Sequence, residues 1–312
     1  MYHLLNHARI RIIVTATILV SCWVFLPASA TAETEGRMFV DDLQRTIDLP
    51  AVPVRVISLA PSITEMLFAL GLDREIVAVT PFCDYPPEAA QRAKVGYANP
   101  SLERILALAP DVVIAPGEFM RADLLGKLEQ LHIPTVVLTA RSLQDIDKHL
   151  RLLGEVFNRS AETGVVIEAM HRRIEQVTAR VRKEPPIRVL YVLHSQPLIT
   201  VGPGSYLHEL IELAGATNVA RRASTPYPRL AMETVLREDP EVLLFPIGKT
   251  EGIPVGEQES WKQWTDMTAV RTGRLLVLSS DLLNRPGPRI VEGLEILSRM
   301  LHPLPSPMEV TP

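Results

Sequence analysis

The chain has 312 residues and a formal net charge of −4 at neutral pH, a length that accommodates two domains with sizeable cores. A sequence pI near 6.1 argues against a nucleic-acid-binding protein and offers no basic face to anionic lipids. The 26 prolines are spread along the sequence without a low-complexity tract, which is typical of a loop-rich α/β protein.

The first 30 residues have the pattern of a secretory signal peptide. A basic lead precedes the apolar stretch 12–26, and Ala28-Ser29-Ala30 is an Ala-x-Ala cleavage site. We expect cleavage after Ala30, with Ala32 as a second candidate, and export to the periplasm as a soluble protein. A retained anchor helix is one alternative, although about 15 apolar residues are short for a membrane span. Lipoprotein processing at Cys22 is the other; if Cys22 leaves with the leader, the exported chain keeps one cysteine and forms no internal disulfide.

The exported chain begins with a predicted hairpin and continues as a parallel α/β unit. Two short strands are expected to pair across a polar turn, at 38–41 and 46–49. Residues 54–59 and 76–79 predict the first two core strands, because each is a short apolar run bounded by turn residues. Ser62 or Thr64 is placed to cap the helix between these strands.

A helix–strand unit then occurs twice in the chain. Ser101 is expected to cap a short helix, and a buried strand follows at 112–115. A second copy occupies residues 230–246. Any two α/β halves share some likeness, but four matches at one offset of 130 (233 − 103) favour a true repeat. The matched pairs are Glu103 and Glu233, Pro110 and Pro240, Asp111 and Glu241, and Pro116 and Pro246.

The segments that precede this unit match as well. Strands 55–59 and 188–192 are 133 positions apart (188 − 55), whereas the helices that follow them are 144 positions apart (209 − 65). The loop between strand and helix is therefore 11 residues longer in the second half (144 − 133). Two similar lobes whose pocket loops differ in length indicate a ligand held between them.

A long helical tract from Ser142 to about residue 184, with a break expected near 158–160, separates the two copies. No Gly- or Ser-rich linker is present, so the helix itself is the expected connection and predicts small hinge motions. Later strands are expected at 133–138, 187–193 and 274–278, with a terminal helix at 290–301. The predicted organisation is a signal peptide at 1–30, an N-terminal lobe at 37–158, a connecting helix at 159–184 and a C-terminal lobe at 185–304.

The sequence gives little support to an enzyme. Gly-x-Ser-x-Gly, His-Glu-x-x-His and Cys-x-x-Cys motifs are all missing, and the histidines lack metal-ligand spacing. A phosphate-binding loop at Gly248-Lys249-Thr250 is disfavoured because Leu243 stands where its first glycine is needed. His194 sits at a strand end that faces the predicted cleft, where a hydrogen-bonded loop histidine is the alternative. We therefore predict no catalytic residue, no catalytic cofactor and no metal site.

Four stretches together resemble the periplasmic substrate-binding proteins of ABC importers for cobalamin, haem and iron siderophores. They are Arg55–Glu65, Cys83–Ala89, Asn99–Ile114 and Arg285–Arg289. The Asp-Tyr-Pro-Pro loop and the Asn-x-x-Leu-Glu-Arg-Ile helix are most similar to the cobalamin-binding members. The resemblance implies two α/β lobes with mainly parallel sheets, joined by one long backbone helix, with the ligand cleft between the lobes.

The resemblance also implies roles for single residues. Glu103 and Glu233 correspond to surface glutamates that pair with arginines of the transporter's membrane subunits; exposed first-turn carboxylates, favoured by the helix dipole, are the alternative. The residues expected to contact the ligand are Phe82, Tyr85 and Tyr97 from the first lobe, and Tyr227, Asp281 and Arg285 from the second. Loop packing is the alternative for Phe82 and Tyr85. Asp281 and Arg285 match a polar pair that contacts corrin side chains.

Some residues depart from the cobalamin pattern and keep the ligand open. Pro116 and Tyr227 stand where cobalamin binders carry tryptophans, and the early hairpin is more typical of siderophore and haem binders. Tyr97 resembles the axial tyrosine of haem binders, with His194 as a second axial group. The prediction is a monomeric periplasmic receptor that captures a cobalamin-like corrinoid for an ABC importer and binds no nucleic acid. Haem or a ferric siderophore is the alternative ligand, and an exported α/β enzyme is the alternative class.

Overall fold

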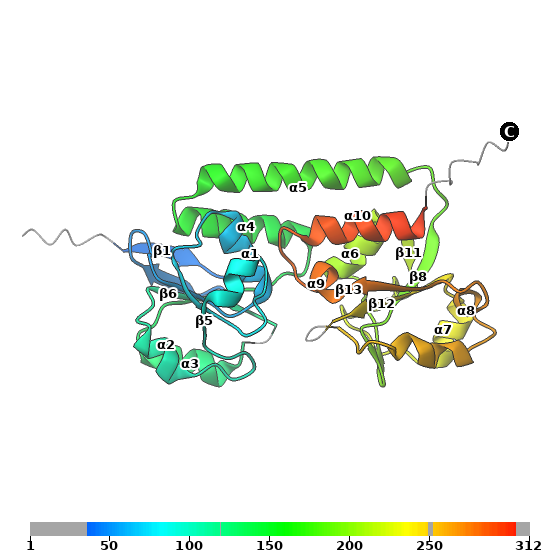
Figure 1. Cartoon of the computed structure of the whole chain (residues 1–312), viewed down its shortest axis with the longest axis horizontal. Coiled ribbons are helices and arrows are strands. Elements are labelled where there is room, and N and C mark those ends of the chain that lie inside the picture. Colours follow the sequence, from blue (N-terminus) through cyan, green and yellow to red (C-terminus); the bar gives the residue numbers. More distant parts are fainter. Residues whose placement is uncertain (1–35, 119, 249–251, 304–312) are drawn as a thin grey trace, which may run out of the picture. The chain divides into compact units, whose positions relative to one another are not determined.

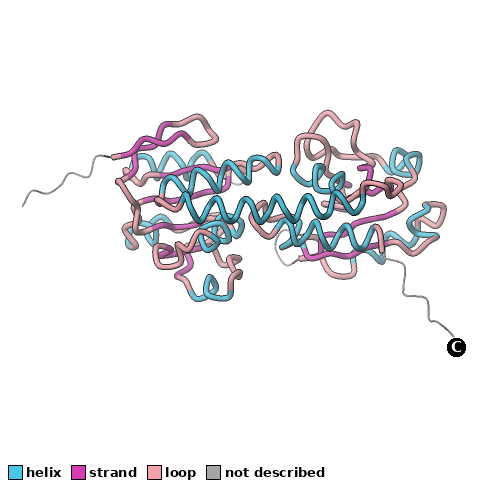
Figure 2. Tube along the Cα trace, turned by 90° about the horizontal axis from the view of Figure 1, so that it is seen from above, coloured by secondary structure: helices cyan, strands magenta, loops and turns pink. Residues whose placement is uncertain are grey.

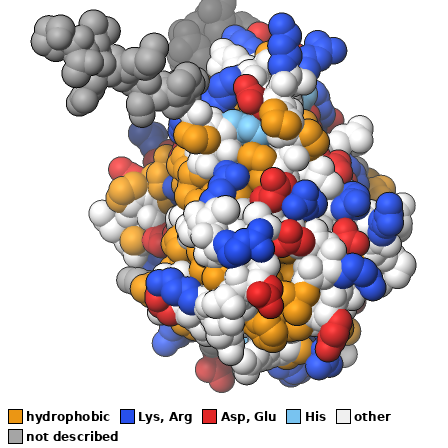
Figure 3. All heavy atoms as spheres, turned by 90° about the vertical axis from the view of Figure 1, so that its right-hand side faces the viewer, with side chains coloured by type: hydrophobic (Ala, Val, Ile, Leu, Met, Phe, Trp, Pro, Cys, Tyr) orange, Lys and Arg blue, Asp and Glu red, His pale blue; other side chains and the backbone are white. Residues whose placement is uncertain are grey.

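The computed structural model describes residues 36–118, 120–248 and 252–303, which form two α/β lobes (Figure 1). The predicted signal peptide and Cys22 lie outside these residues. Within the described ranges no helix is long and apolar enough to cross a membrane. One face, drawn in Figure 3, carries Lys and Arg side chains interspersed with Asp and Glu.

The N-terminal lobe is built on a five-stranded parallel sheet in the order β5-β4-β3-β6-β7. The strands are β3 (Val56–Ser58), β4 (Ile76–Val79), β5 (Ala93–Lys94), β6 (Val112–Pro116) and β7 (Thr135–Leu138). Its helices are α1 (Pro61–Ala69), the 3-10 helix η1 (Pro87–Gln91), α2 (Leu102–Ala107), α3 (Ala122–Gln130) and α4 (Leu143–Val156). The predicted hairpin is confirmed as the antiparallel pair β1 (Arg37–Val40) and β2 (Thr46–Leu49).

The C-terminal lobe repeats this architecture with a four-stranded parallel sheet in the order β11-β8-β12-β13. The strands are β8 (Ile187–Tyr191), β11 (Ala216–Asn218), β12 (Val242–Ile247) and β13 (Leu275–Ser279), with a small hairpin of β9 (His194–Ser195) and β10 (Leu198–Ile199). The helices are α6 (Tyr206–Leu213), α7 (Met232–Glu238), the 3-10 helix η2 (Glu257–Gln263), α8 (Thr268–Arg271), α9 (Ser280–Leu283) and α10 (Ile290–Leu301).

The predicted repeat is confirmed in the structure. Helix α2 begins at Leu102 and α7 at Met232, while β6 begins at Val112 and β12 at Val242, so both elements recur at the offset of 130. Ser101 caps α2 as predicted, because its side chain accepts a hydrogen bond from a backbone N–H of the first turn.

The predicted helical tract and its break are also confirmed. Ser142 and Asp145 form a capping box that starts α4, which ends at Val156. Helix α5 (Ser160–Val181) follows and runs along both lobes (Figures 1 and 2). It lies against α4 of the first lobe and α10 of the second.

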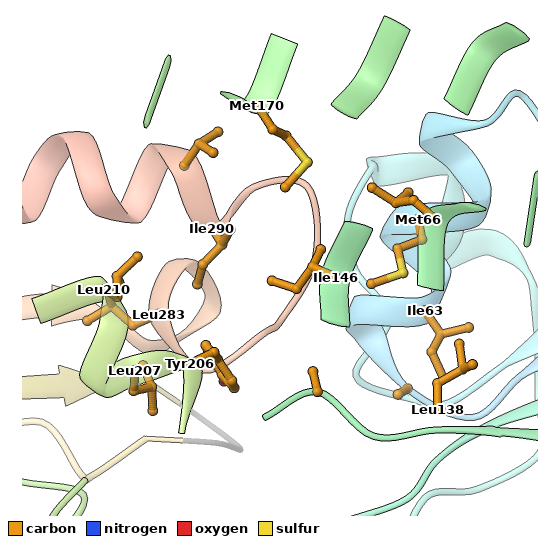
Figure 4. Packing of buried hydrophobic residues seen from close by; sticks show 14 of the residues in the cluster. Ile63, Met66, Leu138, Ile146, Met170, Tyr206, Leu207, Leu210, Leu283 and Ile290 are labelled. Carbon is orange, nitrogen blue, oxygen red and sulfur yellow. The ribbon is translucent and has the colours of Figure 1, made fainter. Parts of the chain in front are cut away.

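One hydrophobic core extends through both lobes and includes α5. In β6, Val112 and Ile114 belong to this core, whereas Val113 and Ala115 point to a separate cluster under α2 and α3. In Figure 4, Met170 of α5 lies between the side chains of the two lobes. Because the core is shared, α5 holds the lobes together by packing as well as by its covalent connection.

One local prediction was wrong. Helix α1 has Ala60 at its N-cap position and no side-chain cap. The Thr64 hydroxyl instead donates to Ala60 O at 3.0 Å and contacts Cys83 Sγ at 3.1 Å. The helix already begins at Pro61, so Ser62 and Thr64 lie inside it, and Ala60 at the N-cap position has no side-chain acceptor.

Candidate functional site

The topology of each sheet predicts where a ligand binds. In the N-terminal sheet the chain moves from β3 to β4 and β5 on one side, then crosses to β6 and β7 on the other. In the C-terminal sheet it moves from β8 to β11, then crosses to β12 and β13. Ligands of open α/β sheets bind at such switch points, at the carboxyl ends of the strands. The expected ligand loops therefore follow β3 and β6 in one lobe and β8 and β12 in the other.

A cleft with a volume of about 550 Å³ lies at this place. This volume is in the range of about 300–1,000 Å³ typical of small-molecule sites. Residues from both lobes line it, and they include the loops after β3, β6 and β8. The described lining residues are Ala60, Ser62, Tyr97, Glu118, Leu193, Tyr206, Leu207, Tyr227, Asn284, Arg285 and Pro286.

Tyr97 is the main aromatic side chain on the N-terminal wall of the cleft. Gly96 precedes it with a φ of +102°, a backbone conformation that a side chain would strain. The ring of Phe82 packs edge-to-face against Tyr97, with 4.8 Å between the ring centroids. Phe82 is not among the described lining residues, so its observed role is to pack against Tyr97.

Tyr227 and Glu118 contribute the polar groups at the opening of the cleft. Burial raises the pKa of the Tyr227 phenol, and the charge of Glu118 raises it further, while Arg141 acts in the opposite direction. Burial also raises the pKa of Glu118, whose Oε1 accepts a hydrogen bond from Ala140 N at 3.2 Å. At neutral pH the phenol of Tyr227 therefore stays protonated and can donate a hydrogen bond.

Asn284 and Tyr206 line the C-terminal side. The hydroxyl of the fully buried Tyr191 donates a hydrogen bond to Asn284 Oδ1, which fixes the orientation of the amide group. Tyr206 opens helix α6 directly after its N-cap Ser205. The cleft thus combines tyrosine rings with an amide and a carboxylate.

Arg285 lies at the floor of the cleft, but carboxylates already surround its guanidinium group. Its Nη1 lies 3.2 Å from Glu65 Oε1 and 2.8 Å from Asp84 Oδ1, and its Nη2 lies 2.7 Å from Asp281 Oδ1. The side chain of Arg285 is 3% exposed. The structure brings Asp281 and Arg285 together as predicted. Their charged groups contact each other, whereas the prediction had both contacting the ligand.

Tyr85 lies outside the cleft. It contributes to a second hollow of about 450 Å³ between α1, α5 and α10. The guanidinium carbon of Arg289 lies 3.7 Å from the centroid of the Tyr85 ring, as in a cation–π contact. The structure therefore groups Tyr97, Tyr227 and Arg285 at the cleft, leaves Phe82 and Asp281 outside its described lining, and separates Tyr85.

His194 is exposed, and its Nδ1 lies 2.9 Å from the carbonyl oxygen of Pro197. It is not a described lining residue of the cleft. Among the residues that the structure describes, no group of three His, Cys, Asp or Glu side chains is placed to hold a metal ion.

Glu103 and Glu233 occupy equivalent places in the two lobes. Each is an exposed residue of the first turn, in α2 and α7 respectively. Both helices bury the residue two positions later, Ile105 in one and Val235 in the other. The repeat therefore gives each lobe one outward carboxylate at the same point of the same unit.

Sequence reasoning missed Glu118, Tyr206 and Asn284. Glu118 follows the Pro116-Gly117 end of β6, and its place after a strand at the sheet's switch point was a usable signal. Tyr206 and Asn284 carried no comparable signal, because each lies at one end of a short helix whose direction depends on tertiary packing.

The comparisons with known proteins agree with this geometry. A family model described as periplasmic binding protein matches residues 56–282. The vitamin B12-binding protein of Vibrio parahaemolyticus is 33% identical over 242 residues, covering 77% of this chain and 86% of that protein. The chain belongs to the periplasmic binding protein family. It is a substrate-binding protein of an ABC importer and not an enzyme.

Two solved structures show the same fold with different ligands in their descriptions. The periplasmic vitamin B12-binding protein BtuF of Vibrio cholerae superposes with a TM-score of 0.68 at 28% identity, over 80% of this chain and 96% of that one. The periplasmic heme-binding protein RhuT of Roseiflexus sp. RS-1 gives a TM-score of 0.70 at 26% identity, over 79% and 97%. The family and the two-lobed fold predicted from the sequence are thus confirmed.

Proposed function

We propose that this protein captures a cobalamin-like corrinoid in the cleft between its lobes and delivers it to the membrane subunits of an ABC importer. The observation that carries the proposal is the lining of the cleft. Tyr97 and Tyr227 offer aromatic faces to a broad apolar ring, and Glu118 and Asn284 offer polar partners to amide side chains. The relatives described as vitamin B12-binding proteins support the same ligand.

The charges around the cleft favour a neutral ligand over one with several carboxylates. Arg285 is the cation among the described lining residues, and three carboxylates already face it. Glu118 adds a negative charge at the opening. Corrin amides are satisfied by neutral donors and acceptors, whereas the propionates of haem need positive partners. Arg141 lies outside the described lining, and its charge partly offsets the rise that burial causes in the pKa of Tyr227.

Haem is the second candidate, and Tyr97 is the observation that favours it. A phenol at the wall of the cleft is a suitable axial ligand for ferric iron, and the neighbour described as a heme-binding protein has the same fold. A ferric siderophore remains a third ligand of the same metal-chelate class. The absorption spectrum of protein purified from the periplasm distinguishes these ligands. We expect corrinoid bands after loading with cyanocobalamin, and co-purifying haem bands would overturn the proposal.

We further propose that Glu103 and Glu233 dock the two lobes onto basic residues of the membrane subunits. Exposed ion pairs contribute about 0–1 kcal/mol each, so a single substitution should leave the complex intact. Reversing both charges with Glu103→Lys and Glu233→Lys should impair corrinoid uptake by cells while ligand affinity stays unchanged. Exposed Glu162 and Glu168 on α5, changed in the same way, serve as the control pair. Normal uptake by the Glu103/Glu233 variant would remove the docking role.

Export is part of the same proposal. The Ala-x-Ala site predicts a soluble periplasmic protein that begins at Thr31 or Glu33. The intact mass of the purified protein tests this, and a lipid-modified Cys22 would contradict it.

A further inference from the structure

We propose that Arg285 is a positioning residue that joins the two lobes and sets the width of the cleft. Arg285 and Arg289 come from the C-terminal lobe, whereas Glu65 and Asp84 come from the N-terminal lobe. We call these four residues the interlobe clasp. The inference goes beyond the proposed function and does not depend on which ligand binds.

The contacts of the clasp cross from one lobe to the other. Arg285 Nη1 donates to Asp84 Oδ1 at 2.8 Å and to Glu65 Oε1 at 3.2 Å. Arg289 Nη1 donates to the same Glu65 oxygen at 3.4 Å. Residues 285 and 65 are 220 positions apart in the chain, so the contact is a tertiary link between the lobes.

Burial makes these contacts geometrically demanding. The side chains of Arg285 and Glu65 are 3% and 2% exposed, and buried charges are tolerated only when they are paired and hydrogen-bonded. A guanidinium group presents its donors in a rigid planar fork, so its partners must stand at fixed positions. Carboxylates from α1 and from the loop after β4 can meet that fork at only a narrow range of lobe separations.

The clasp also lies where it can control the cleft. Arg285 and Pro286 form part of the cleft lining, whereas Glu65 and Arg289 line the second hollow next to α5. The clasp is therefore a wall between the two spaces and the floor of the ligand cleft. Asp281, from the same lobe as Arg285, holds Nη2 at 2.7 Å and orients the fork toward the other lobe.

The chain offers a matched control for this role. Arg173 of α5 forms a two-point ion pair with Glu295 of α10, at 2.7 and 3.0 Å. The pair involves the same chemical groups, but it joins α10 to the connecting helix and lies outside the described cleft lining. If any arginine–glutamate pair of this kind fixed the lobes, replacing Arg173 and replacing Arg285 would change the distance between the lobes equally.

The experiment measures the distance between the lobes in the ligand-free protein. Spin labels are placed on cysteines introduced at Leu106 of α2 and Leu236 of α7, which are 45% and 38% exposed. Cys22 is replaced by serine, and the remaining Cys83 is buried. We expect a narrow distance distribution in the parent protein and in Arg173→Met. We expect Arg285→Met to broaden and shift the distribution, and Arg285→Lys to do so partially because it keeps the charge without the fork.

Arg285→Met leaves Glu65 buried without this partner, so the double variant Glu65→Gln/Arg285→Met is measured beside it in case the single variant fails to fold. Broadening in either variant supports the clasp. A distribution in both that matches the parent, or equal broadening in Arg173→Met, would overturn it. The measurement uses no ligand, so its outcome does not depend on the corrinoid proposal. If the protein does not bind a corrinoid, the predicted distances between the lobes are unchanged.

Discussion

The two lobes share a helix–strand unit but differ where their sheets face the cleft. Units α2–β6 and α7–β12 recur 130 positions apart (232 − 102) and place one exposed glutamate on each lobe. Helix α1 begins three residues after β3 ends, whereas the hairpin of β9 and β10 stands between β8 and α6. The repeated part thus suits a symmetric partner, and the unrepeated loops suit an asymmetric ligand.

Arg285, at the floor of the cleft, contacts residues of both halves. Removing its side chain should therefore have the largest effect on the free energy of unfolding. Arg285→Ala leaves the buried Glu65 with Arg289 as its remaining arginine contact, and removing one partner of a buried ion pair costs about 3–5 kcal/mol. Urea denaturation at pH 8 measures the free energy of unfolding. The more exposed pair is the comparison: Arg173→Ala should cost no more than about 1 kcal/mol. Equal losses of unfolding free energy in Arg285→Ala and Arg173→Ala would mean that Arg285 does not join the lobes through a buried ion pair.

The titration of Glu65 should have the next largest effect. Burial raises the pKa of this carboxyl from 4.5 to about 7, although Arg289 and Arg285 act in the opposite direction and Asp281 adds to the rise. The folded protein therefore binds the proton more tightly than the unfolded chain does. This contribution to stability is complete below about pH 4.5 and is lost as the pH rises to about 7.

Glu65→Gln removes this titration. Between pH 4.5 and 8, the parent should lose about 2–3 kcal/mol more stability than the variant does. Urea denaturation of both proteins across this range measures the difference. Parallel pH profiles would show that Glu65 has an ordinary pKa and that the floor of the cleft is more solvated than its burial indicates.

A smaller effect distinguishes the two exposed tyrosines. Tyr227 and Tyr85 are 44% and 42% exposed, but Tyr227 lines the cleft and Tyr85 lines the second hollow. Tyr227→Ala should weaken corrinoid binding by about 1–3 kcal/mol, the usual cost of a lost contact. Tyr85→Ala should leave the dissociation constant unchanged. A fluorescence-quenching titration with cyanocobalamin measures the dissociation constant of both variants. A loss of affinity in Tyr85→Ala alone would indicate that the ligand binds in the second hollow and not in the cleft.

The smallest effect is expected at Tyr97. Tyr97→Phe removes the phenol oxygen and keeps the ring that packs on Phe82, so a corrinoid should bind with nearly unchanged affinity. A haem site would lose its axial ligand and the associated absorption band. Loss of the absorption band of a bound chromophore in Tyr97→Phe would therefore indicate that the ligand is haem and not a corrinoid.

Local patterns predicted much of the fold because they were strong where tertiary packing agreed with them. The terminal helix at 290–301 was predicted with the bounds of α10, and the hairpin strand at 46–49 with those of β2. Helix α3, strand β11 and the four-residue helix α9 were not predicted, because short or mixed segments take their form from the surrounding structure.

The site was predicted less completely than the fold. Tyr97, Tyr227 and Arg285 were identified and line the cleft, but the pairing of Arg285 with Glu65 and Asp84 had no signal in the sequence. Those partners are 220 and 201 positions away, and a pattern of neighbouring residues carries no information about such contacts. The resemblance to a family supplied residue types, whereas the structure supplied their partners.

Parallel calorimetric titrations test the identity of the ligand most directly. Apo-protein is titrated with cyanocobalamin, haemin and a ferric siderophore under the same conditions. We predict saturable binding of one cyanocobalamin per chain, with markedly weaker binding of the other two. Saturable binding of haemin or the siderophore, with no heat from cyanocobalamin, would contradict the account.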